Sequence, residues 1–286
     1  SEERLPFEPK GWLRQLRDEI RRGVYMLRDE PGRVLAALYR SSVMQVCDVE
    51  NVLFYNVGPA TFGALASTGL RFERAFFKPP PVNTRKPVQH YQHYSFAPKA
   101  TGFSYWKVDH LLARWQRVEY RRTAGRLDVA SVWRSMKLGA GSGQVMVESM
   151  SEVPLARLAL NVVVHIPRGI HLNLAVAIKP IFDGIIAAFH KHDGSDEDII
   201  VGRLAGQLSV KEGEVISLLR NGLEPLLGTR RLVWPWGKSV QWNPADDLLV
   251  AGQMLIEQNS STDDWEFSGQ LFTVADDLRQ PRTFNM

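Results

Sequence analysis

The sequence of 286 residues predicts an α+β protein with an N-terminal helical segment and a mixed or antiparallel sheet that carries helices on one face. Three observations predict this class. The stretch from residue 12 has apolar residues at helical spacing, runs rich in valine between residues 128 and 167 are separated by a glycine-rich turn, and residues 171–188 repeat apolar side chains at intervals of three and four. A hydrophobic fraction of 44% and a charged fraction of 23% are those of a globular protein with a sizeable core.

The N-terminal segment predicts an amphipathic helix, because Trp12, Leu16, Ile20 and Val24 recur on one face. Arginines lie between these apolar residues, at Arg14, Arg17 and Arg21. They either contact the phosphates of a nucleic acid or form an ordinary solvated face.

The next notable group is Asp48-x-Glu50-Asn, which is followed by an apolar run, a helix-like stretch over residues 60–68 and a strand-like stretch over residues 70–77. Asp48 and Glu50 have two interpretations. They are paired ligands of a divalent metal, since Mg²⁺ prefers carboxylate oxygens, or they are acidic caps at a helix N-terminus.

The middle of the chain predicts a helix over residues 105–122, then strands over residues 128–139, 144–150 and 155–167, with a turn at Gly139 to Gly143. Before it, His90 and His93 have a spacing that would place both on one helical face. They are either a partial metal site or ordinary histidines of a tyrosine-rich loop.

The last part of the chain predicts helices over residues 171–188 and 210–222, an apolar run over residues 199–208 and a late strand at residues 269–274. Trp234, Trp236 and Trp242 lie near turn residues, where tryptophans cap a core edge or stack on bases. Asp246 and Asp247 form a second candidate metal group.

Charge is distributed unevenly along the chain. Residues 1–140 hold 23 Lys and Arg against 13 Asp and Glu, whereas residues 141–286 hold 12 against 18, so a front half of +10 precedes a back half of −6. A polyanionic partner, contact between the halves, or plain solvation accounts for this split. We expect either a basic region over 1–125 and a second region over 126–286, or one domain.

Several classes of protein are excluded or disfavoured by the sequence. It has no apolar run of 18 residues and no signal-peptide pattern, so we expect no membrane insertion, and its single cysteine, Cys47, predicts a reducing compartment, the cytoplasm. Motifs for nucleotide binding, zinc proteases and serine hydrolases are absent from the sequence.

Residues 155–205 have the order strand, basic loop, helix with internal Lys-Pro and Asp-Gly, acid-rich loop and apolar run. This order resembles the core of the RusA-type Holliday-junction resolvases. Lys179 matches the lysine of that family, Phe182-Asp183-Gly184 matches its Leu-Asp-Gly step, and an acidic pair comes from the loop that contains Asp193, Asp196 and Asp198.

The chain departs from the family where two metal-binding aspartates are expected, because Asn173 and Ala175 stand there. Neither side chain can hold Mg²⁺. Three alternatives follow: the metal ligands come from elsewhere in the chain, the centre is catalytically dead, or the resemblance is accidental. Asp48-Val49-Glu50-Asn51 has the spacing of the missing group, which supports the first alternative.

Together these features predict binding of structured DNA or RNA, with cleavage dependent on Mg²⁺ or Mn²⁺ or with a degenerate centre that no longer cleaves. The alternative is a scaffold subunit of a protein assembly or homo-oligomer. The resemblance implies that Lys179 contacts the scissile phosphate and that Asp183 is catalytic. The expected metal ligands are Asp48, Glu50, Asp183, Asp193, Asp196 and Asp198, and the expected nucleic-acid contacts are Arg14, Arg17, Arg21, Arg121, Arg122 and Arg168.

Overall fold

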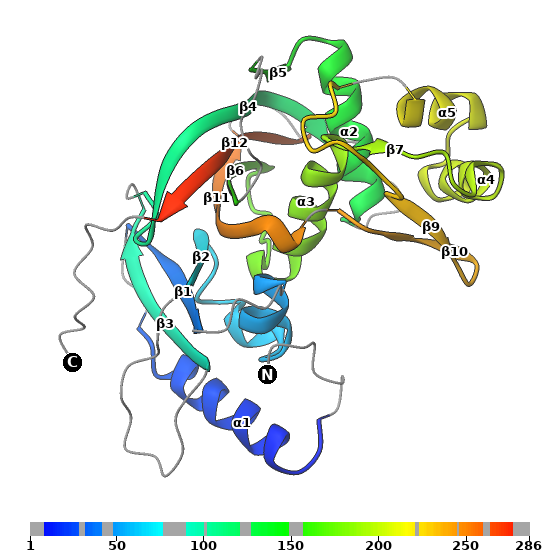
Figure 1. Ribbon diagram of the computed structural model, residues 1–286. Coiled ribbons are helices and arrows are strands. Elements are labelled where there is room, and N and C mark those ends of the chain that lie inside the picture. The colour runs from blue at the N-terminus through cyan, green and yellow to red at the C-terminus, as the bar shows by residue number, and fades with distance from the viewer. Residues whose placement is uncertain are drawn as a thin grey trace.

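The computed structural model describes residues 9–28, 32–41, 48–76, 90–99, 102–120, 127–148, 157–220, 223–244, 246–259 and 264–276. It contains a large mixed sheet with helices on one face, which confirms the predicted α+β class (Figure 1). In chain order the elements are α1 (Trp12–Tyr25), β1 (Arg33–Ser41), the π-helical turn η1 (Asn51–Tyr55), the 3₁₀ turn η2 (Pro59–Phe62), β2 (Gly69–Ala75), β3 (His90–Pro98), β4 (Trp106–Tyr120), α2 (Val129–Gly141), β5 (Val145–Val147), β6 (Leu158–Pro167), α3 (Leu174–Ala188), β7 (Lys191–His192), α4 (Glu197–Leu208), α5 (Glu212–Arg220), β8 (Thr229–Arg230), β9 (Val233–Trp236), β10 (Ser239–Trp242), the 3₁₀ turn η3 (Asp246–Leu248), β11 (Leu249–Asn259) and β12 (Trp265–Asp276).

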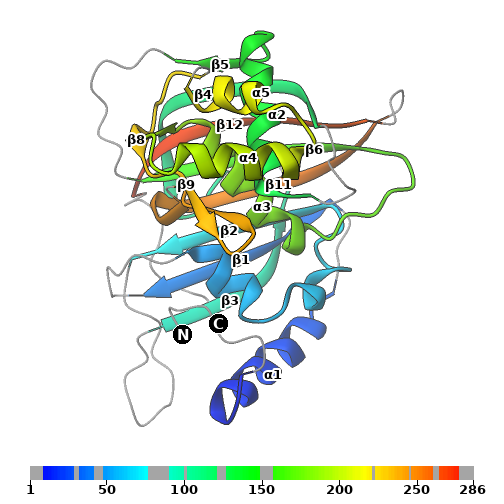
Figure 2. The ribbon, with the colours of Figure 1, turned by 90° about the vertical axis from the view of Figure 1, so that its right-hand side faces the viewer.

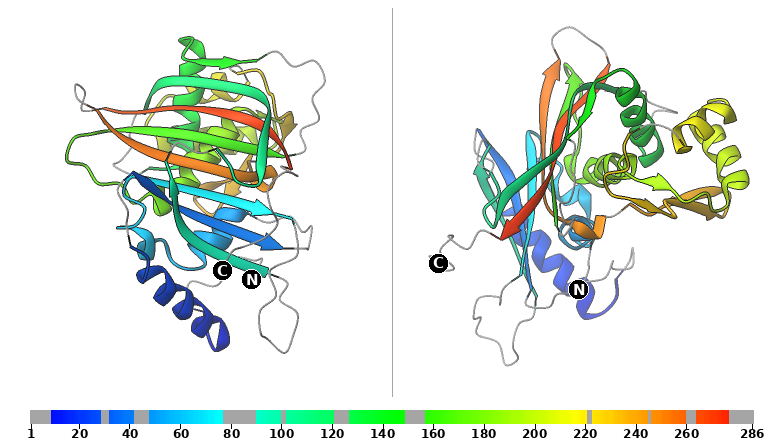
Figure 3. Two further views of the ribbon diagram at one scale, coloured as in Figure 1. Left: turned by 90° about the vertical axis from the view of Figure 1, so that its left-hand side faces the viewer. Right: turned by 45° about the horizontal axis from the view of Figure 1, so that its top comes forward.

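The main sheet has eight strands in the order β3-β1-β2-β11-β6-β12-β4-β5. β1 runs parallel to β2 and β11 runs parallel to β6, while the other neighbours are antiparallel. Strands that precede and strands that follow residue 125 therefore belong to the same sheet. One face of the sheet lies behind the helices and the other is not crossed by any described helix (Figures 2 and 3).

Helix α3 packs its apolar side chains on the sheet, as the spacing predicts. Ile178, Ile181 and Phe182 are completely buried. The close packing depends on glycine, since a Cβ on Gly184 would lie 2.8 Å from the carbonyl oxygen of Val129 in α2. Lys179 and Asp183 lie four residues apart on the same face of this helix, where their side chains form an ion pair.

Two predicted elements were wrong, because residues 106–120 form the long strand β4 and residues 129–141 form the helix α2. Bulges in its pairing with β12, together with a positive φ of 51° at Arg117, give β4 an irregular burial pattern that resembles a helical one. The start of α2 is marked by Asp128, whose carboxylate accepts a hydrogen bond from the backbone N–H of Ser131 at 3.0 Å.

The two histidines of the tyrosine-rich stretch lie on strand β3, so the helical spacing proposed for them does not apply. An interval of three residues places His90 and His93 on opposite faces of a strand. His90 forms a hydrogen bond with the hydroxyl of Tyr39 at 2.9 Å.

No helix in the described part of the chain has the length and apolar character needed to cross a membrane.

Candidate functional site

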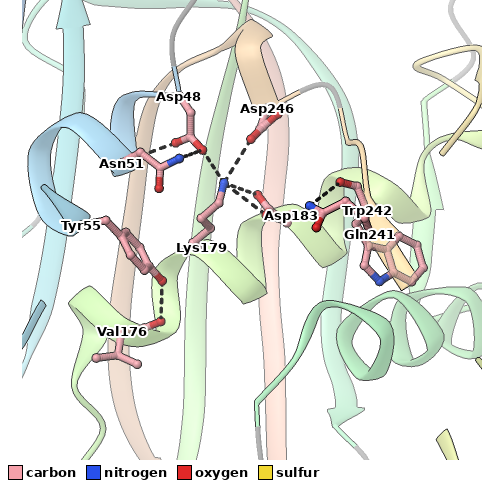
Figure 4. Close-up of polar contacts among 9 residues, drawn as sticks. All are labelled: Asp48, Asn51, Tyr55, Val176, Lys179, Asp183, Gln241, Trp242 and Asp246. Atoms are coloured by element: carbon pink, nitrogen blue, oxygen red, sulfur yellow. Dashed lines mark hydrogen bonds and ion pairs between the residues drawn. The ribbon is translucent and has the colours of Figure 1, made fainter. Parts of the chain in front are cut away.

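A largely buried lysine on α3 lies among carboxylates that come from distant parts of the chain (Figure 4). The ammonium of Lys179 pairs with Asp48, with Asp183 at 3.3 Å and with Asp246 at 3.1 Å. Glu50 lies close enough to interact with these charges. We call Asp48, Glu50, Asp183 and Asp246, with Lys179 among them, the carboxylate cluster.

The topology of the sheet explains how these residues meet. β1 and β2 are parallel and β11 is antiparallel to β2, so the C-terminal end of β1 and the N-terminal end of β11 lie at the same end of the strands. Asp48 follows β1 and Asp246 precedes β11, so both lie at that end of the strands. Helix α3 crosses the covered face and brings Lys179 and Asp183 to them.

Asp48 also begins the helical turn that follows it. Its carboxylate accepts hydrogen bonds from the backbone N–H of Asn51 at 3.1 Å and from the side-chain amide of Asn51 at 2.6 Å. The acidic cap that the sequence predicted as one alternative is therefore present. The same carboxylate also contacts Lys179, so the cap and the cluster share one side chain.

Glu50 is the most unusual member of the cluster. It is fully buried, and within the described residues no N–H or O–H group donates a standard hydrogen bond to either of its carboxylate oxygens. It is held there by its own segment, in which Val52, Leu53 and Phe54 pack into the core. A buried carboxyl group without donors is costly unless it is protonated or meets a cation.

The lysine and the capping aspartate are both stabilised in their charged forms. Burial opposes ionisation of Lys179, but the carboxylates of Asp183, Asp48 and Glu50 outweigh it and raise the lysine pKa. Burial also opposes ionisation of Asp48, but the ammonium and the hydrogen bonds that Asp48 accepts lower its pKa. This pair is therefore ionic at neutral pH.

The remaining carboxyl groups hold protons more tightly than usual. Burial, together with the charge of Asp48, raises the pKa of Glu50 well above its ordinary range. Burial raises the pKa of Asp183 to about 7, with Asp246 and Asp48 adding to the effect and Lys179 opposing it. Burial and the charge of Asp48 also raise the pKa of Asp246. One lysine is too little positive charge for four carboxyl groups, so protons supply the balance.

Three members of the cluster are partly exposed to solvent. The side chains of Lys179, Asp48 and Asp246 are 21%, 18% and 22% exposed, whereas Glu50 is completely covered. Tyr55 lies near Lys179, and its hydroxyl donates to the carbonyl of Val176 at 3.2 Å. Lys179, Asp48 and Asp246 are therefore the members that a ligand can contact without displacing the buried Glu50.

No three His, Cys, Asp or Glu side chains of the described residues are grouped as a ready-made metal site. Within the carboxylate cluster, the lysine ammonium takes the central position among the oxygens. The arrangement is acidic, and its carboxyl groups can exchange protons near neutral pH.

The structure brings together only some of the acidic residues that the sequence singled out. Asp48, Glu50 and Asp183 meet, and Asp246 of the second candidate group joins them. Asp193 accepts a hydrogen bond from the backbone N–H of Ser195, Asp196 pairs with Arg231, and Asp198 lies exposed in the first turn of α4, so these three have structural surroundings outside the cluster.

Asn173 and Ala175, which stand where the resemblance would place two aspartates, both have structural roles. Asn173 caps α3 by accepting a hydrogen bond from the backbone N–H of Ala175 at 3.1 Å, and Ala175 is completely buried. Two other acidic residues, Asp48 and Glu50, lie near Lys179 although they come more than a hundred residues earlier in the chain.

The predicted arginines are arranged in two places. Arg14 is exposed on α1, while Arg21 donates to the carbonyl of Val57 at 2.6 Å and thereby joins α1 to the segment that carries Glu50. Arg17 also lies on α1, and Arg168 is exposed in the turn after β6. Arg121 and Arg122 lie outside the described residues.

Comparison with known proteins adds no assignment: no family model, no curated protein and no solved structure matches this chain.

Proposed function

We propose that the carboxylate cluster is a catalytic centre that uses a divalent cation, Mg²⁺ or Mn²⁺, to hydrolyse a phosphodiester bond in structured nucleic acid. The observation that carries the proposal is the convergence of four carboxyl groups from three chain segments on Lys179, with Glu50 buried and lacking a hydrogen-bond donor among the described residues. A fold gains no stability from such an excess of buried acid, which favours a functional reason for it.

The residues fit a hard divalent cation. Carboxylate oxygens are the ligands that Mg²⁺ and Mn²⁺ prefer, and the two oxygens of Glu50 have no other donor in the described structure. Asp48 and Asp246 are the partly exposed members that would hold the ion from the solvent side, with Asp183 and Glu50 below. Cation binding would release the protons that now balance the cluster.

The bound cation supplies charge stabilisation for the phosphodiester and a more acidic water. The chain's own residues have separate tasks. Lys179, whose raised pKa keeps it charged, holds a phosphate oxygen as an ammonium donor. Before the cation binds, Asp183 has a pKa of about 7 and can release its proton near neutral pH, which leaves a carboxylate that can hold the ion. The resemblance to RusA-type resolvases implies that Lys179 contacts the scissile phosphate and that Asp183 is catalytic.

Arginines outside the cluster would position the substrate backbone. Arg14 and Arg17 lie on α1, which Arg21 attaches to the segment carrying Glu50. Arg168 lies in an exposed turn. Contacts of this kind carry little sequence information, so we expect recognition of shape and backbone.

The test uses labelled four-way junction, duplex and single-stranded DNA with purified protein in EDTA, Mg²⁺ or Mn²⁺, read on native and denaturing gels. We expect cleavage that requires the cation, and binding that weakens log-linearly with salt. Asp183→Asn should lose cleavage by at least about a hundredfold while retaining DNA binding.

The matched control is Asp198→Asn, which removes one carboxylate from an exposed position outside the cluster. It should cleave like the wild type. Binding without cleavage under any cation would limit the function to recognition, and neither binding nor cleavage would reject the proposal in favour of the scaffold alternative.

A further inference from the structure

A second lysine, Lys137 of α2, is buried without a carboxylate partner in the described structure. Its relative exposure is 5%, and its ammonium makes one long hydrogen bond, 3.4 Å to the carbonyl oxygen of His190. An ammonium has three donors and is strongly hydrated in water. Two of the donors of Lys137 therefore have no hydrogen-bond acceptor in the described part of the chain.

The side chain lines a pocket of about 320 Å³ between α2, β7 and the end of α5, which we call the Lys137 pocket. Lys191 and Arg220 contribute further positive charge to its lining. Glu224 is the acidic residue of the described lining, and the apolar walls come from Leu219, Leu223 and Pro225. Its volume is that of a site for a small molecule.

The surroundings of the pocket are positive as well. Arg220 is already paired with Glu197 at 2.9 Å, which lies outside the lining. Burial, with the charges of Arg230 and Lys137 adding to it, lowers the pKa of His190 to about 4, so this histidine is neutral at neutral pH. Burial likewise lowers the pKa of Lys137 to about 8. A ligand with negative charge would therefore complement the charge of this lining.

We propose that the Lys137 pocket binds a small phosphate-bearing anion, with Lys137 as the buried donor and Lys191 at the rim. A phosphate group accepts several hydrogen bonds at once, which matches the donors of Lys137 that lack acceptors. The apolar walls suit the carbon part of a phosphate monoester. The phosphate comes either from a free small molecule or from the terminus of a nucleic-acid strand.

The Lys137 pocket is separate from the carboxylate cluster and does not depend on its proposed function. Lys179 lies nine residues before the end of α3 at Ala188, which corresponds to about 14 Å along the helix axis. The pocket begins beyond that end, at Lys191. The two sites can therefore be tested independently.

The experiment is a set of calorimetric titrations at constant ionic strength in chloride buffer. The probes are inorganic phosphate, glycerol 3-phosphate, and one short DNA strand carrying either a 5′-phosphate or a 5′-hydroxyl. We expect at least one phosphate probe to bind the wild type, and Lys137→Met to weaken that binding about tenfold or more. Lys191→Gln should weaken it only a few-fold, because this lysine is exposed.

The matched control is Lys238→Gln, which removes a lysine charge from an exposed turn outside the pocket lining. Its affinity for phosphate should equal that of the wild type. A strand that binds only with its 5′-phosphate identifies a nucleic-acid terminus as the source, whereas binding of the small phosphates alone identifies a free ligand. Failure of every probe, or equal binding to Lys137→Met, overturns the proposal.

A second measurement covers the case in which Lys137→Met does not fold. The wild-type protein is acetylated with and without phosphate, and labelling is read by peptide mass spectrometry. Phosphate should slow the labelling of Lys137 and leave that of Lys238 unchanged. Equal labelling of Lys137 in both conditions would contradict occupancy of the pocket.

Discussion

Lys179 and Lys137 lie in the same helical layer, on the neighbouring helices α3 and α2, and differ in what surrounds them. Lys179 meets three carboxylates within 3.3 Å, and its pKa is raised. Lys137 meets a single carbonyl, and its pKa is lowered to about 8. Burial acts in the same direction on both, so the carboxylates decide the difference. One site has an excess of negative charge and the other an excess of positive charge.

The largest expected effect comes from Lys179→Met, which removes the ammonium from the carboxylate cluster. Four acidic groups then remain without a cation, and breaking a buried ionic contact of this kind costs about 3 kcal/mol. The loss should be greatest at pH 8 and smaller at pH 5, where the carboxyl groups are protonated. Urea denaturation in EDTA at both pH values measures it.

The control for this variant is Lys238→Met, which removes an exposed lysine. Its free energy of unfolding should stay within about 0.5 kcal/mol of the wild type. If Lys179→Met were equally harmless at pH 8, the lysine would not be the counter-ion of the cluster, and the contrast with Lys137 would fail.

Asp183→Asn should have the opposite effect on stability. The pKa of Asp183 is raised to about 7, above its unfolded value, so the folded state holds a proton that the unfolded state has lost between about pH 4 and pH 7. The wild type therefore loses stability as pH rises through that window. The asparagine variant lacks this loss, and we expect it to gain roughly 1–2 kcal/mol over the wild type at pH 8 and little at pH 4.

Denaturation curves of Asp183→Asn and the wild type in EDTA, recorded from pH 4 to pH 8, check this expectation. Asp198→Asn, at an exposed position, serves as the reference. A constant difference across the pH range would mean that Asp183 does not titrate near neutrality. It would also remove the proposed proton exchange at this residue.

Periodic and compositional patterns in the sequence predicted several elements of the fold. Helices α1 and α3 follow from apolar residues at intervals of three and four, and β6 follows from its run of valines. The exchange of helix and strand between β4 and α2 arose because bulges give β4 an irregular burial pattern, while α2 is buried on most of its surface. For both elements the burial came from tertiary packing, which outweighed the local pattern.

The carboxylate cluster was predictable in part. Lys179 and Asp183 share a helix, so their four-residue spacing places them together, and Asp48-x-Glu50 has a spacing typical of metal-binding pairs. Asp246 could not be ranked above Asp193 or Asp196 from the sequence. It joins the cluster because β11 begins where β1 ends, a consequence of strand order that local spacing does not contain.

Lys137→Met tests whether the buried ammonium of Lys137 lowers the stability of the protein. The pKa of Lys137 is lowered to about 8, so its charged form is penalised in the folded state, and that penalty is present below pH 8 and lost as pH rises toward the ordinary lysine pKa. Methionine keeps most of the length of the side chain without the charge. We expect the variant to gain about 1 kcal/mol at pH 6 in phosphate-free buffer and less at pH 10. Thermal unfolding at both pH values measures the gain, and a loss of stability at pH 6 would mean that the ammonium has a stabilising partner.

Glu50→Gln should change stability least and cation binding most. The raised pKa favours the protonated form of Glu50, so an amide of the same shape replaces a neutral group with a neutral group and can still donate a hydrogen bond toward Asp48. We expect the free energy of unfolding in EDTA to change by less than about 0.5 kcal/mol. Mn²⁺ binding, followed by electron paramagnetic resonance, should weaken about tenfold or more, because the amide cannot become an anionic ligand.

Strong destabilisation would mean that Glu50 is ionised without a cation, and unchanged Mn²⁺ affinity would mean that its buried oxygens do not face the ion. Unchanged stability together with lost Mn²⁺ affinity is the result expected of a carboxyl group that is neutral without the ion and charged when the ion is bound. Lys179→Met cannot give this result, because it lowers the stability of the protein even without the ion.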